Sequence, residues 1–138
     1  MSDPFVASPV DYLRRNYRIL HSDEANDTYI FATSFDAKIS ANFRIMIDED
    51  IAMIYVELFN LARIPVDLHL DLLLEISTAA IFGISIIPGV TIELTNIILP
   101  SSSSEAEFNI LLHMMNQDFN DVIDHVREVK PEIMRFVS

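Results

Sequence analysis

Asp67, His69 and Asp71 are the residues whose types and spacing most resemble a metal site, because carboxylate and imidazole groups are common metal ligands. They fall in a segment that we expect to be helical, where successive residues turn by about 100 degrees. His69 therefore points roughly 160 degrees away from the two aspartates. We expect no metal site here, but a solvated helix face with a buried or interfacial histidine.

Other chemically active groups are also poorly spaced for catalysis. Asp48, Glu49 and Asp50 resemble the start of a calcium-binding loop, but its sixth position is Met53 and its twelfth is Phe59. We interpret the trio as a charged hairpin tip. The histidines occur singly, and the chain has two glycines and no cysteine. We therefore predict no catalytic residue, no cofactor and no enzymatic activity.

Composition limits the classes of partner. With 138 residues, the chain is expected to form a single domain over 1–138. Nine basic residues against 21 acidic ones give a net charge of −12, which opposes approach to phosphate backbones, so we expect no nucleic-acid partner. Apolar residues make up 51% of the chain, which leaves room for exposed apolar surface.

The longest uncharged run, from Ile76 to Ile92, is a poor membrane span. It is interrupted by Gly83, Pro88 and Gly89, and it is shorter than the roughly 20 apolar residues that a spanning helix needs. The first fifteen residues lack a basic segment followed by an apolar run. We therefore expect no membrane span, no secretory signal and a cytoplasmic location.

Turn formers divide the first half of the chain into a short helix and two hairpins. Ser8 as N-cap and Pro9 as first helical residue predict a helix that ends near Arg15. Residues rich in β-branched and aromatic side chains then predict four strands, at 17–22, 28–35, 39–47 and 51–59.

Pro65 begins the next predicted helix. Asp67, Asp71, Glu75 and Thr78 recur at intervals of four, four and three, so they form one polar stripe. We expect the rest of this helix to be buried and Gly83 to end it in a left-handed cap.

A third hairpin and a long helix complete the chain. Pro88 and Gly89 suit the centre of a type II turn between two strands. Ser104 and Glu107 form a capping box ahead of a helix that Pro131 stops, and the tail after it either folds back or docks on a partner.

The long helix has one broad apolar face, most of which we expect to be core. Because the helix is long for one small sheet, we also expect part of this face to be an interface. The candidate partner-binding residues are Phe108, Leu111, Leu112, Met115, Phe119 and Val122.

The predicted fold class is α+β. It comprises a short N-terminal helix, an antiparallel sheet of about five to six strands built from hairpins, one helix between strand groups, and a long C-terminal helix packed on one face. In this order the chain resembles the YbjN-like and type III secretion chaperone-like proteins. The likeness covers nearly the whole chain and is carried by "VDYLRRNYRIL", by "IAMIYVELF" leading to "VDLHLDLLLEISTAAIFG", and by "ISIIPGVTIELTNIILP" followed by "SEAEFNILLHMMNQDFNDVIDHV". Four strands are expected before Pro65, where the secretion chaperones usually have three.

The resemblance implies a non-catalytic, commonly dimeric domain whose exposed apolar patches hold extended segments of other proteins. We therefore expect a protein-binding or chaperone-like module that acts as a homodimer. The alternative is a small-molecule or lipid-binding domain with a cavity between the sheet and the long helix.

Overall fold

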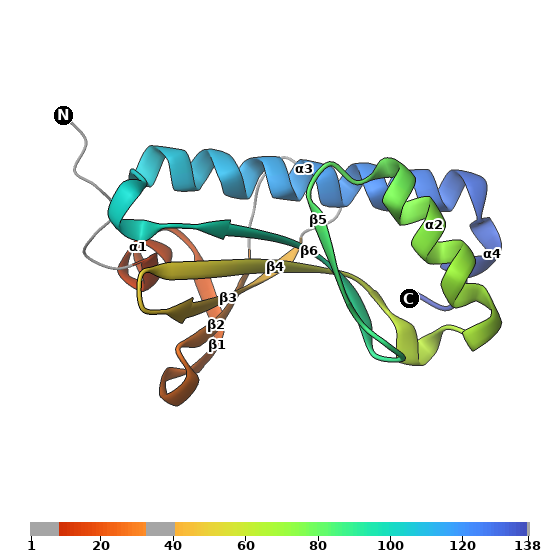
Figure 1. Ribbon diagram of the computed structural model, residues 1–138, viewed down its shortest axis with the longest axis horizontal. Coiled ribbons are helices and arrows are strands. Elements are labelled where there is room, and N and C mark those ends of the chain that lie inside the picture. Colours follow the sequence, from red (N-terminus) through yellow and green to blue (C-terminus); the bar gives the residue numbers. More distant parts are fainter. Residues whose placement is uncertain (1–8, 33–40, 138) are drawn as a thin grey trace.

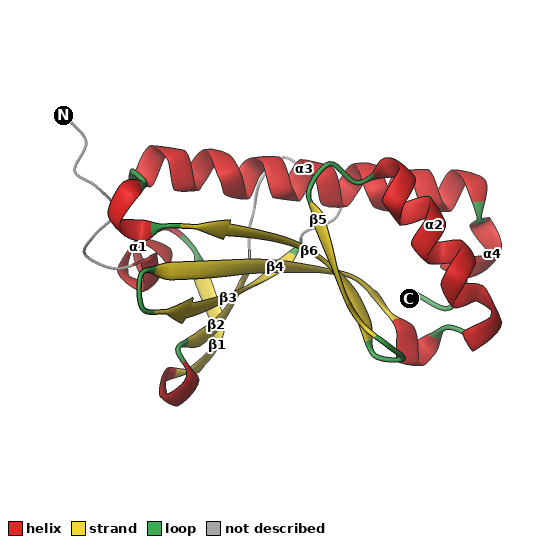
Figure 2. Cartoon of the chain, viewed as in Figure 1, coloured by secondary structure: helices red, strands yellow, loops and turns green. Residues whose placement is uncertain are grey.

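The computed structural model describes residues 9–32 and 41–137 and shows a sheet with helices on one face (Figures 1 and 2). The predicted α+β class is confirmed, and the sheet has six antiparallel strands. The elements are α1 (Pro9–Asn16), β1 (Arg18–Asp23), β2 (Thr28–Ala32), β3 (Asn42–Asp48), β4 (Ile51–Asn60), α2 (His69–Ala79), β5 (Gly83–Ile87), β6 (Thr91–Ile98), α3 (Glu105–Val129) and α4 (Pro131–Met134).

The strands lie in the order β1-β2-β3-β4-β6-β5, so the last hairpin adds β6 beside β4 and leaves β5 at the edge. The predicted turn of this hairpin is confirmed. Val90 N donates to Ile87 O at 2.9 Å, and Gly89 at the third turn position has a φ of 73°. A side chain there would strain the backbone, which is why a type II turn favours glycine at this position.

The capping box begins α3 as predicted. Glu107 N donates to the hydroxyl of Ser104 at 3.1 Å, and Ser104 N donates to the Glu107 carboxylate at 3.4 Å. The apolar face of α3 then packs on the inner face of the sheet (Figure 2), where Phe43, Ile54 and Leu94 are fully buried.

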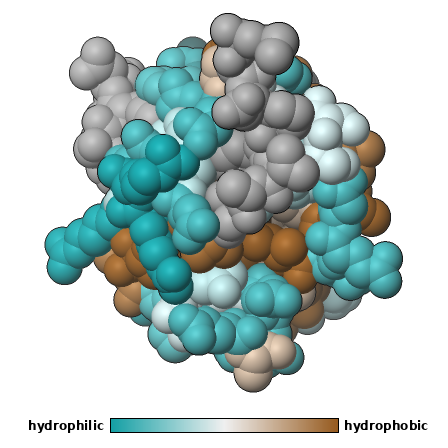
Figure 3. Space-filling model, turned by 90° about the vertical axis from the view of Figure 1, so that its left-hand side faces the viewer, coloured by the Kyte–Doolittle hydropathy of each residue, from teal (hydrophilic) through white to brown (hydrophobic). Residues whose placement is uncertain are grey.

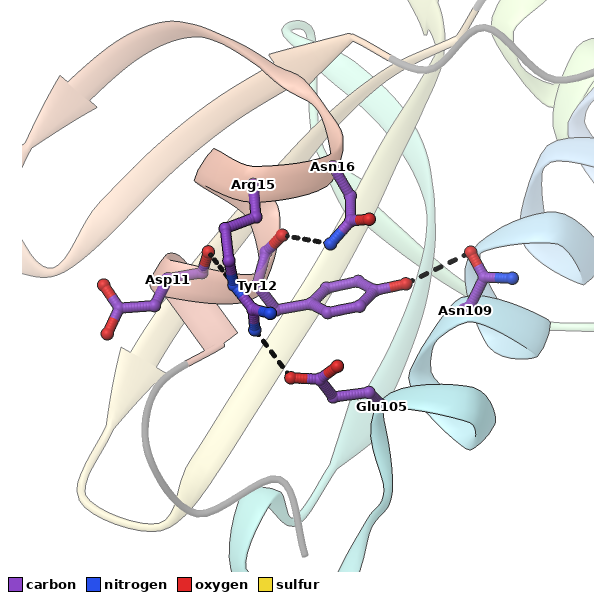
Figure 4. A network of polar contacts seen from close by, with 6 residues as sticks. All are labelled: Asp11, Tyr12, Arg15, Asn16, Glu105 and Asn109. Carbon is purple, nitrogen blue, oxygen red and sulfur yellow. Dashed lines mark hydrogen bonds and ion pairs between the residues drawn. The ribbon is translucent and has the colours of Figure 1, made fainter. Parts of the chain in front are cut away.

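α1 is fastened to the first turns of α3 by a polar network (Figure 4). The Tyr12 hydroxyl donates to Asn109 Oδ1 at 3.2 Å, and Arg15 pairs with Glu105 at 2.6 Å. Tyr17, directly after α1, also donates its hydroxyl to Asn109 Oδ1, at 3.0 Å. Burial raises the pKa of Tyr17, so its hydroxyl keeps its proton, and remains a donor, to a higher pH than that of an exposed tyrosine.

The connection from α2 to β5 differs from the prediction. α2 ends at Ala79, and Gly83 lies inside β5, so the predicted left-handed cap at Gly83 is wrong. The buried Asp118 of α3 instead holds the connection between α2 and β5. Its carboxylate accepts hydrogen bonds from the backbone N–H groups of Ile81 and Phe82 at 3.0 to 3.1 Å. These bonds hold an extended connection that needs no glycine.

Replacing Asp118 with alanine should therefore destabilise the fold. The change leaves two backbone N–H groups without their acceptor in a part-buried position, and we expect a loss of about 3 kcal/mol in urea unfolding. Asp121→Ala is the matched control, because Asp121 is exposed on the same helix and should change stability by less than about 0.5 kcal/mol. Equal losses in the two variants would contradict this role for Asp118.

Candidate functional site

The predicted partner-binding residues lie mainly in the core. Five of the six are buried and Leu111 is half-buried. The second half of α3 is covered by α2 and α4 as well as by the sheet, so part of the extra apolar length expected from the sequence is used inside the domain, whereas Ile110, Met114 and Val129 of α3 are exposed. A partner has little access to this stripe, whose members are Phe108, Leu111, Leu112, Met115, Phe119 and Val122.

Accessible apolar surface lies elsewhere, first of all on α2 and the single 3-10 turn (Val66–Leu68) that precedes it. Val66, Leu70 and Leu74 follow one another at intervals of four and are 80%, 66% and 56% exposed. The prediction that α2 is buried outside its polar stripe is therefore wrong. Only one side of α2 reaches α3, where Leu72 and Ile76 are buried, and the opposite leucines face outward. Further apolar surface forms a band at the end of the molecule that carries α1 (Figure 3).

The edge strand β5 is a second accessible apolar surface. It contains no charged residue and no proline, and it pairs with β6 without a bulge. Ile86 and Ile87 are 40% and 45% exposed. The opposite edge, β1, carries charged Arg18 and Asp23 and has a bulge that follows Ile19. Charges and bulges prevent an edge strand from pairing with another chain, so β1 is protected and β5 is open.

The helix-free face of the sheet contains a hollow of about 430 Å³ that is lined by both apolar and charged side chains. At its centre, Arg44 of β3 donates to both carboxylate oxygens of Glu93 of β6, at 2.9 and 3.2 Å. The Arg44 guanidinium also lies 4.4 Å from the ring centroid of Tyr55, on β4 between them. This contact holds the guanidinium over the ring and directs it at the carboxylate.

Two carboxylates meet in this hollow, because Glu57 of β4 pairs directly with Glu93 in the strand register. Burial raises the pKa of Glu93, the Arg44 cation opposes that rise, and the Glu57 charge adds to it. The folded protein therefore holds the Glu93 proton more tightly than the unfolded chain does. The resulting stabilisation of the fold is complete below the pKa that Glu93 has in the unfolded chain, and it is lost as pH rises through the higher pKa of the folded protein.

The residues first considered as metal ligands do not converge. Asp67 and Asp71 are exposed, whereas His69 Nε2 lies 3.1 Å from Leu61 O and 2.7 Å from Ile64 O. His69 thus holds the turn before α2, as expected of a buried or interfacial histidine. Within residues 9–32 and 41–137, no group of three or more His, Asp or Glu side chains is arranged to hold a metal ion, and no helix is long and apolar enough to cross a membrane.

The cluster of Arg44, Tyr55 and Glu93 could not be recognised from the sequence alone. Each of these residues alternates with buried neighbours in its strand, and this alternation places all three on one face. Alternation alone does not show that β6 lies beside β4. The contact between Arg44 and Glu93 therefore required the strand order.

Comparison of the chain with family models, with curated proteins and with solved structures finds no match. The resemblance to YbjN-like and type III secretion chaperone-like proteins therefore remains a prediction.

Arg44→Ala tests how much the ion pair between Arg44 and Glu93 stabilises the fold, because it leaves the Glu93 carboxylate buried without its cation. We expect a loss of about 3 kcal/mol at pH 7. The loss should be smaller at pH 5 than at pH 7, because burial raises the pKa of Glu93 and a lower pH favours its neutral form, which needs no counter-ion. Urea unfolding at both pH values measures the difference.

The double variant Arg44→Ala/Glu93→Gln is the control for this pH dependence. Without an ionisable group at position 93, its loss should differ little between pH 5 and pH 7. An Arg44→Ala loss that is the same at both pH values would contradict this account of the pair.

Proposed function

We propose that this chain is a non-catalytic, cytoplasmic protein-binding module that forms a homodimer by pairing β5 with β5 of a second copy. The observation that carries the proposal is the open edge of the sheet at β5, opposite a protected edge at β1 (Figure 1). An edge strand presents unpaired backbone N–H and C=O groups, which another strand can satisfy.

The chemistry of β5 favours a second copy as its partner. The strand reads Gly-Ile-Ser-Ile-Ile, so antiparallel pairing around Ser85 brings no like charges together. Such pairing follows a two-fold axis, and each copy gives and receives the same contacts. Ile86 and Ile87, which are partly exposed in the single chain, would lose solvent contact at this junction.

The α2 surface supports the chaperone-like part of the proposal. Leu70 and Leu74 remain available beside Asp67, Asp71 and Glu75, and residues 64–126 contain no Lys or Arg. An apolar segment of another protein that carries basic side chains would match this surface in both hydrophobicity and charge.

The enzyme hypothesis requires titratable side chains to meet in one concave site, and Glu57 and Glu93 do so. Glu93 is nevertheless bound by Arg44 through both oxygens. Its carboxylate is thereby held as an ion-pair partner rather than as a free acid or base, so we favour a structural role for the pair.

Ile87→Lys tests the dimer. A lysine on the open edge should oppose strand pairing, so we expect the variant to sediment as a monomer where the unaltered protein sediments as a dimer. Ile97→Lys is the matched control, because Ile97 is more exposed but lies on β6, outside the stretch Thr91–Thr95 that pairs with β5. An unaltered protein that is monomeric at high micromolar concentration would refute the proposal.

Leu70→Glu/Leu74→Glu tests the α2 surface separately. We expect this variant to bind much less of an apolar fluorescent dye while its sedimentation as a dimer is unchanged, since neither leucine lies in β5. Unchanged dye binding would show that α2 is not the accessible apolar surface.

A further inference from the structure

We propose that a groove beside the second half of α3 binds a carboxylic acid with a long apolar chain, of the fatty-acid class. The groove lies where the end of β4 meets α3 and the residues of α4 and the tail after it, and its volume is about 690 Å³. Sites for small molecules typically have volumes of about 300 to 1,000 Å³. The groove does not include β5, so this inference is independent of the proposed dimer.

The floor of the groove is apolar and well packed. Phe59, Phe119 and Ile123 line it and are at most 7% exposed, so their positions are fixed by the core. Met134 and Phe136 form a half-buried wall, held because α4 folds back on α3. Aromatic rings and a flexible thioether suit contact with a hydrocarbon chain, which can adopt many shapes.

Two arginines also line the groove. Arg63 forms no ion pair with any residue in the described part of the chain, and its side chain is exposed. Arg127 pairs with Asp124 of its own helix at 3.0 Å, but half-exposed pairs of this kind contribute little and are readily exchanged. Both guanidinium groups can therefore receive an anion.

Two arginines at one groove are unusual in a chain with this distribution of charge. No Lys or Arg occurs between Arg63 and Arg127, and the fold brings these two residues to one groove in a protein with a net charge of −12. A carboxylate matches the planar guanidinium group through two parallel hydrogen bonds. Glu57 lines the same groove and disfavours a ligand with a second acidic group. A ligand with a single carboxylate on an apolar chain would pair with the arginines and would bring no second acidic group near Glu57.

Titration with dodecanoate and dodecanol tests the inference, because the two share one chain length and differ in the head group. Calorimetry should show that dodecanoate binds at least about tenfold more tightly, as expected for a charge-assisted hydrogen bond. Equal affinities, or no binding of dodecanoate, would overturn the proposal.

Arg63→Gln/Arg127→Gln should weaken dodecanoate binding about tenfold or more and leave dodecanol binding unchanged. Arg14→Gln/Arg18→Gln is the matched control, since it removes the same charge from residues that do not line the groove. Met134→Trp, which fills the groove, should weaken both ligands. Equal weakening by the two arginine pairs would show a general charge effect and refute the site. Sedimentation as a dimer should not change in any of these variants, so failure here and failure of the dimer are distinguishable.

Discussion

The contact between the apolar face of α3 and the inner face of the sheet is the constraint on which the other parts of the fold depend. Phe108, Leu112 and Met115 have no solvent exposure, and full burial of a side chain of this size contributes about 1.5 to 3 kcal/mol. The other helices are arranged around the same helix. α1 is held at Asn109, the connection after α2 is held at Asp118, and α4 folds back at its end.

This one-sided arrangement gives the two faces of the sheet different chemistry. The covered face is apolar, whereas the helix-free face holds a charged pair in a hollow with Tyr55 beneath it. The groove lies beside the second half of α3, where the end of β4 meets it and α4 returns.

Local patterns in the sequence predicted the elements well, because a strand, a capping box or a type II turn depends on neighbouring residues. The start of α3 could be predicted from Ser104 and Glu107 alone, and the turn between β5 and β6 from Pro88 and Gly89. The orientation of α2 was not predictable, since leucines occur on every side of it and only α3 decides which are buried. The site residues were equally inaccessible to such reasoning. Arg44 and Glu93 are 49 positions apart and meet only through the strand order.

The bulge and charges of β1 have a consequence for how far the sheet can extend beyond one molecule. A subunit with two open edges could join copies head to tail, and repetition of that contact would produce a filament. Because the bulge and charges of β1 oppose pairing with β5 of another molecule, the proposed assembly through β5 would stop at two copies. An unpaired edge strand at the surface would then not lead to polymerisation.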